Sequence, residues 1–103
     1  MLRRRLSPLV LAALAVAPVV AGCAGLPVQQ MSDARQAITA AEQAGAAQYA
    51  PELLAESKRL VDRAKVNLND GEYRQSRQDA ELAREKAMEA RRIAEAARGV
   101  QGP

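Results

Sequence analysis

The spacing of apolar and polar residues along the chain predicts three helices after residue 31. Ser32 is a suitable N-cap with Asp33 in the first turn, and the first helix then ends near Gly45. Its apolar residues recur at intervals of three and four, at Ala34, Ala37, Ile38, Ala41 and Ala44. The following stretch GAAQYAPE predicts a corner, in which Pro51 suits the first turn of the next helix.

The second helix is predicted from about Pro51 to Asn69, and the sequence NDG at 69–71 is a turn signal. One face of this helix carries Leu53, Ser57, Leu60, Val61, Ala64 and Leu68. The third helix is predicted from about Glu72 to Arg98, roughly 40 Å long at 1.5 Å per residue. We therefore expect an all-α fold, a short three-helix antiparallel arrangement in which a helical hairpin joins an N-terminal helix.

The inward positions of the long C-terminal helix form a heptad seam made mostly of alanine. Their spacing alternates between three and four, at Tyr73, Ser76, Ala80, Ala83, Ala87, Ala90, Ala94 and Ala97. Alanine favours helix and lets backbones approach closely, but it buries little area. We expect a thin core, widened by Leu82, Met88 and Ile93, and completed by a protein partner or by self-association.

The residues before the helices have the three zones of an export signal. A cationic start, Met1 to Arg5, precedes a mostly apolar run from Leu6 to Val20 and two small residues, Ala21 and Gly22. The run is about 15 residues long and contains prolines, whereas a membrane-spanning helix needs about 20 apolar residues. A cleaved signal is therefore favoured over a transmembrane anchor.

The sequence Val20-Ala21-Gly22-Cys23 resembles the lipobox of bacterial lipoproteins. The resemblance implies cleavage between Gly22 and Cys23, a diacylglyceryl group on the thiol of Cys23, and an acyl chain such as palmitate on the new amino terminus. Two or three acyl chains anchor a protein stably in a membrane, whereas one does so only marginally. The alternative is an unmodified cysteine that behaves as a small hydrophobic residue.

Cleavage at this position would remove the positive charge that the whole chain carries. The chain has 15 Lys and Arg and 12 Asp and Glu, and its net charge is +3. Arg3, Arg4 and Arg5 precede Cys23 and every acidic residue follows it, so residues 23–103 are formally neutral. With no Phe or Trp for base stacking either, the sequence does not favour nucleic acid as a partner.

The composition also offers little for catalysis or for a metal. Histidine is absent and the single cysteine is assigned to lipidation, so we expect no metal site, no cofactor, no small-molecule substrate and no enzyme. The stretch NLNDGE at 67–72 superficially suggests a calcium loop, but its glycine and its twelfth residue, Gln78, do not fit the pattern. The acidic and basic pairs on the helices, such as Arg77 with Glu81 and Arg91 with Glu95, are expected on a solvated face.

A peptide-binding helical repeat is the alternative function. The stretch GEYRQSRQDAELA at 71–83 resembles the turn and second helix of a tetratricopeptide repeat, with matches at Gly71, Glu72, Tyr73, Ala80 and Ala83. One such unit is visible, whereas about three repeats are needed for a stable array.

A wider resemblance covers residues 31 to 98. The stretches SDARQAI at 32–38 and AGAAQYAPELLA at 44–55, followed by GEY and regularly spaced alanines, are similar to the domain-of-unknown-function family numbered four-three-nine-eight. The resemblance implies an all-helical protein of the Gram-negative cell envelope without known catalytic residues. Ala24 and Gly25 lack the aspartate of an inner-membrane retention signal, which favours the outer membrane.

These observations together predict four segments. Residues 1–22 form a signal peptide for the general secretory route, 23–31 a lipidated N-terminus and tether, 32–98 the helical domain, and 99–103 a flexible tail. The tether residues 24–30 reach at most roughly 25 Å at about 3.4 Å each. The predicted function is that of a lipid-anchored structural or adaptor module at the outer membrane, facing the periplasm.

Overall fold

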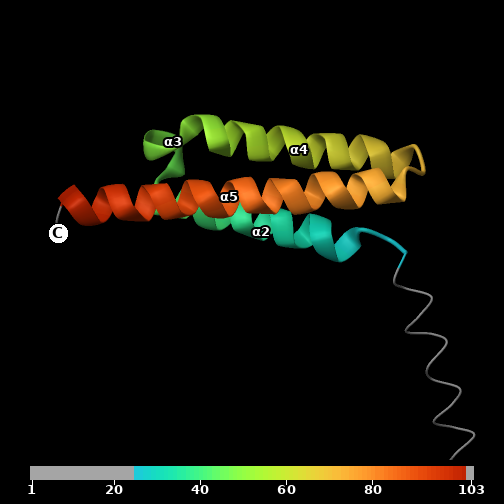
Figure 1. Cartoon of the computed structure of the whole chain (residues 1–103), viewed down its shortest axis with the longest axis horizontal. Coiled ribbons are helices and arrows are strands. Elements are labelled where there is room, and N and C mark those ends of the chain that lie inside the picture. The colour runs from blue at the N-terminus through green and yellow to red at the C-terminus, as the bar shows by residue number, and fades with distance from the viewer. Residues whose placement is uncertain (1–24, 102–103) are drawn as a thin grey trace, which may run out of the picture.

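The computed structural model describes residues 25–101, and every regular element in that range is a helix (Figure 1). The elements are α2 (Val28–Ala44), α3 (Ala46–Tyr49), α4 (Pro51–Asn69) and α5 (Tyr73–Gln101). Helix α4 runs antiparallel to α5, and α2 runs in the same direction as α5 (Figure 1). The predicted all-α class and the long C-terminal helix are thus confirmed.

Helix α5 is the element on which the others pack. It contacts α4 and α2 along much of its length, whereas α2 and α4 contact each other less extensively. The short helix α3 lies in the corner between α2 and α4 and also contacts α5. The arrangement follows from the seam, because a stripe of small residues along α5 lets two helices approach it side by side.

Helix α2 begins earlier than the sequence analysis predicted. Its N-cap is Pro27 rather than Ser32, and the Pro27 carbonyl oxygen accepts a 3.0 Å hydrogen bond from the Met31 amide. Ser32 lies inside the helix, where its hydroxyl oxygen accepts a 3.4 Å hydrogen bond from the Gln36 side chain. Proline suits a helix start because its φ angle is fixed near the helical value. Residues 28–31 of the predicted tether are therefore helical.

The corner between α2 and α4 depends on Gly45. Its φ of 99° is left-handed, and its amide caps α2 by donating to the carbonyl oxygen of Glu42 at 3.0 Å. Arg98 of α5 reaches the same helix end, where its Nη1 donates to the Ala44 carbonyl oxygen at 3.1 Å. Pro51 then occupies the first turn of α4, as predicted.

The second turn joins α4 to α5 at the opposite end of the bundle. Helix α4 has the predicted bounds, and Gly71 in the turn after it has a φ of 79°. The amide of Glu72 donates to the Asn67 carbonyl oxygen at 2.8 Å and so satisfies one of the last carbonyls of α4. Helix α5 starts one residue later and ends three residues later than predicted.

The seam alanines of α5 are buried within the single chain, except Ala97 near its end, which is half-buried. Ala80, Ala83, Ala87, Ala90 and Ala94 have no exposed surface. The largest core cluster adds Ile38, Leu54, Leu60 and Val61 from α2 and α4. The seam is therefore closed by helices of the same chain, and a partner would have to contact other surfaces.

Some predicted inward residues lie on the surface instead. Tyr73 is 44% exposed, because it is the first residue of α5 and α4 has already ended at Asn69. Leu82, Met88 and Ile93, which were expected to widen the core, are exposed as well. In α4 it is Leu54 that is buried, while its neighbour Leu53 is half-buried.

Candidate functional site

The predicted attachment site lies just outside the part of the chain that the structure describes. Cys23 and the lipobox residues Val20, Ala21 and Gly22 precede Gly25, where the description begins. Among residues 25–101, no helix is long and apolar enough to cross a membrane. The described residues also contain no group of three or more His, Cys, Asp or Glu side chains that could hold a metal ion.

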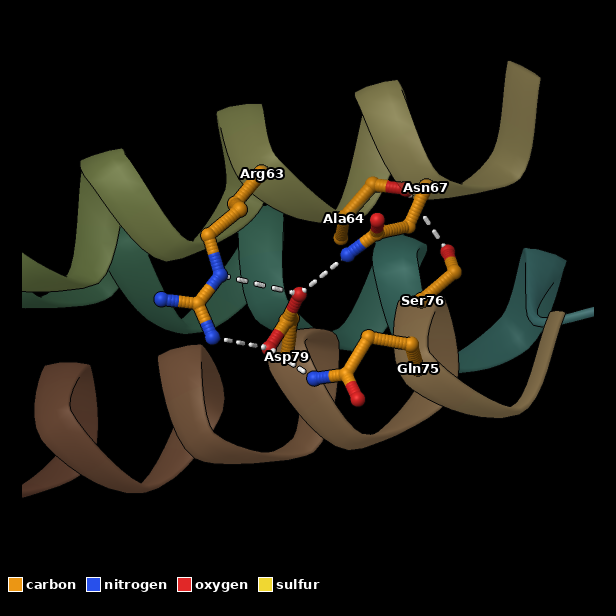
Figure 2. Close-up of polar contacts among 6 residues, drawn as sticks. All are labelled: Arg63, Ala64, Asn67, Gln75, Ser76 and Asp79. Carbon is orange, nitrogen blue, oxygen red and sulfur yellow. Dashed lines mark hydrogen bonds and ion pairs between the residues drawn. The ribbon is translucent and has the colours of Figure 1, made fainter. Parts of the chain in front are cut away.

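The most elaborate polar cluster surrounds Asp79 of α5, between α4 and α5 (Figure 2). Arg63 donates from Nε to Oδ2 of Asp79 at 3.3 Å and from Nη2 to Oδ1 at 3.1 Å. Asn67 donates to Oδ2 at 2.7 Å, and Gln75 donates to Oδ1 at 3.1 Å. Both carboxylate oxygens thus accept two hydrogen bonds, and the side chain of Asp79 is 3% exposed.

This arrangement defines what the Asp79 cluster can do. Four donors satisfy both oxygens of this buried carboxylate, and hydrogen bonds to a charged group are stronger than neutral ones. A general base, in contrast, needs an oxygen directed at a substrate proton. The chemistry of the cluster is therefore that of a clamp, which fixes the register of α5 against α4.

Two buried serines make a second kind of contact between helices. The hydroxyl of Ser76 donates to the Ala64 carbonyl oxygen at 2.7 Å, and that of Ser57 donates to the Ala83 carbonyl oxygen at the same distance. Both serines are fully buried. The chain has no histidine that could act as their base, and both hydroxyl protons are donated to backbone carbonyl oxygens of the neighbouring helix.

The described surface offers shallow grooves. A groove of about 420 Å³ runs between α2 and α5, and its lining includes Asp33, Arg84, Met88 and Arg91. A neighbouring hollow shares Asp33 and Arg84 and adds Glu81. Each groove is lined by both acidic and basic side chains, so neither presents a single sign of charge to a ligand.

The surface ion pairs among residues 25–101 are exposed to solvent. Arg91 pairs with Glu95 at 2.7 Å, as expected from their spacing, and each side chain is about half exposed. Arg77, in contrast, donates to the carbonyl oxygen of Gly25 at 2.9 Å and so joins the start of α5 to the start of the described chain. This second contact has no signal in the sequence, because the two residues are 52 positions apart.

The fold and its polar contacts define a class of protein: a small, all-helical bundle held by alanine packing and interhelical hydrogen bonds. Residues 29–99 match the family described as Domain of unknown function (DUF4398), and the chain belongs to this family. The family resemblance predicted from the sequence is thereby confirmed. No curated protein and no solved structure matched the chain.

The Asp79 cluster was not predicted from the sequence, because the carboxylates were expected on solvated helix faces. The signal that could have found it is the hairpin itself. Asp79 and Arg63 each lie eight positions from Gly71, while Gln75 and Asn67 each lie four positions from it. Because α4 and α5 run antiparallel on either side of Gly71, residues at equal distances from this glycine lie opposite each other on the two helices.

Proposed function

We propose that this protein is a lipid-anchored module of the bacterial cell envelope, facing the periplasm, in which the helical bundle acts as a structural or adaptor element. The sequence Val20-Ala21-Gly22-Cys23 after a cationic and apolar leader is the observation that carries the anchor. Two or three acyl chains on Cys23 would hold the protein at the membrane surface.

The described structure supports a binding role over a chemical one. The buried carboxylate of Asp79 and the hydroxyls of Ser57 and Ser76 are all engaged in holding helices together. What α5 presents outward is a set of exposed apolar side chains, among them Leu82, Met88 and Ile93. Apolar side chains mark a protein-contact surface where they lie together, and Ile93 shares one hollow with Tyr49, Pro51 and Leu53.

The peptide-binding repeat gains no support from the arrangement of the helices. A tetratricopeptide array needs about three stacked hairpins to form a groove. Residues 25–101 contain one hairpin of this size, α4 with α5, and α2 of the same chain packs on α5. A structural or adaptor role is the proposal that fits a single closed bundle.

The anchor is tested by fractionating cells that produce Cys23→Ala. We expect uncleaved precursor in the inner membrane, while the neighbouring control Ala24→Ser is processed and reaches the outer membrane. Ala24→Asp should place a retention signal beside the lipid and hold the processed protein in the inner membrane. Unchanged mobility and unchanged outer-membrane location of Cys23→Ala would contradict the anchor.

The adaptor role is tested by photo-crosslinking in living cells. A photoreactive residue is placed at Met88 or Ile93, which are exposed, and at Ala87, which is buried, as the control. We expect a defined crosslinked product from the exposed positions and none from Ala87. If the exposed positions give no product in an intact envelope, the adaptor role is wrong and a purely structural one is favoured.

A further inference from the structure

The first described residues are fixed to the bundle. The carbonyl oxygen of Gly25 accepts the 2.9 Å hydrogen bond from Arg77 Nη2. Pro27 is among the fully buried side chains, and its carbonyl oxygen accepts the hydrogen bond that starts α2. A segment with these contacts cannot act as the long tether that its sequence predicted.

These contacts leave only a short length of chain between Cys23 and the bundle. Only Ala24 separates Cys23 from Gly25, and two steps of the chain span at most about 8 Å. A predicted tether of roughly 25 Å is thus replaced by a very short link. If Cys23 carries the acyl chains, the end of the bundle that contains Gly25 lies at the bilayer surface.

That end of the bundle carries exposed apolar side chains. Leu26 is 49% exposed, Val28 is 62% exposed and Tyr73 is 44% exposed. The first turns of α2 and α5 lie at the same end of the molecule (Figure 1), and Arg77 joins Gly25 to α5 one turn after Tyr73. We name Leu26, Val28 and Tyr73 the anchor-end patch.

We infer that the anchor-end patch is a membrane-contact surface, which rests in the interfacial region of the bilayer beside the acyl chains of Cys23. The inference rests on the proposed lipid anchor. Tyrosine and aliphatic side chains favour the boundary between headgroups and acyl chains. The short link keeps the patch at high effective concentration near that boundary, so even weak contacts are occupied.

A bilayer fits the patch better than a second protein does. A stable protein interface buries roughly 800 Å² on each partner and uses about 20 residues a side. Three side chains at the end of a slim bundle are far fewer than that. Side chains can insert one by one into the headgroup region of a bilayer without a surface of matching shape. The covalent anchor at Cys23 would hold them close to that region.

Tryptophan fluorescence tests the inference, because the chain contains no tryptophan. Tyr73→Trp and Leu26→Trp place a probe in the anchor-end patch, and Val100→Trp, which replaces a side chain 88% exposed near the end of α5, is the matched control. The processed proteins are purified from membranes of producing cells and inserted in vesicles of phosphatidylethanolamine and phosphatidylglycerol. Flotation of the vesicles reports anchoring, and brominated lipids report contact.

We expect all three variants to float and the patch probes to be quenched by brominated lipid at least about twofold more strongly than Val100→Trp. Equal quenching of the patch and control probes in floating protein would overturn the membrane-contact surface while leaving the anchor intact. Protein that does not float would overturn the anchor, and the membrane-contact surface with it.

Discussion

The hydroxyl group of Ser57 donates a 2.7 Å hydrogen bond to the backbone carbonyl oxygen of Ala83 on the neighbouring helix. Such a contact requires two helix backbones to lie close together, and only small side chains at the crossing permit that. Ser57 and Ala83 are both without exposed surface. The bundle is thus stabilised by close approach of helices more than by large apolar side chains.

Two replacements of Ser57 should separate the contribution of its hydrogen bond to stability from that of close helix packing. Ser57→Ala should lower the free energy of unfolding by about 1 kcal/mol, the net value of one hydrogen bond. Ser57→Leu should cost about 1–3 kcal/mol more, because the added methylenes force the helices apart. Denaturant unfolding followed by circular dichroism measures both. Ala55→Leu, at an exposed position of α4, is the control and should change little.

A charge in the seam should unfold the bundle. Ala87→Glu buries a carboxylate without a partner, and an uncompensated buried charge costs about 3–5 kcal/mol. A single core in a domain of this size rarely supplies more than about 3–5 kcal/mol, so most molecules should lose their helical signal. Ala96→Glu places the same charge on the exposed side of α5 and should leave the melting temperature nearly unchanged. Equal melting of the two variants would show that the seam faces water.

The Asp79 clamp should contribute more to stability than a surface ion pair does. Asp79→Ala removes four hydrogen bonds to a charged, buried group, and we expect a loss of about 2–3 kcal/mol. The control is Glu95→Ala, which breaks the exposed pair with Arg91 and should cost at most about 0.5 kcal/mol. Urea titrations of the two variants give the comparison. Similar midpoints would mean that the clamp does not hold the helices.

A side chain at Gly45 should destabilise the corner, because the backbone there is left-handed with a φ of 99°. We expect Gly45→Ala to cost about 1–2 kcal/mol through this backbone strain. A steric clash should add nothing, because the new Cβ would lie 3.5 Å or more from its nearest neighbours, an ordinary contact distance. Gly99→Ala, inside α5 with nothing near its Cβ position, should instead stabilise by up to about 1 kcal/mol. Thermal melts of both variants test the opposite signs.

The sequence predicted the helices well where strong local signals punctuate the chain. Pro51 and the NDG turn define α4 at both ends, and Gly45 ends α2. The regular spacing of alanines likewise indicates which face of α5 is inward, since a helix of this length has one stripe at that period. These features depend on local propensity and periodicity, which a sequence contains directly.

The remaining features depend on contacts between distant residues. Leu53 and Leu54 are adjacent and both apolar, so only the packing of α4 decides that Leu54 is buried. The link from Arg77 to Gly25 and the burial of Asp79 arise from the way the helices cross. Periodicity along one helix carries no information about its rotation against another, and these parts of the site could not be read from it.

Attachment of the bundle to the membrane through Cys23 can be measured as the intact mass of the protein extracted from membranes of producing cells. We expect the mass of residues 23–103 plus a diacylglyceryl group and an amide-linked acyl chain, with both modifications on the fragment that begins at Cys23. The mass of the complete chain, or a processed chain with an unmodified thiol at Cys23, would contradict it.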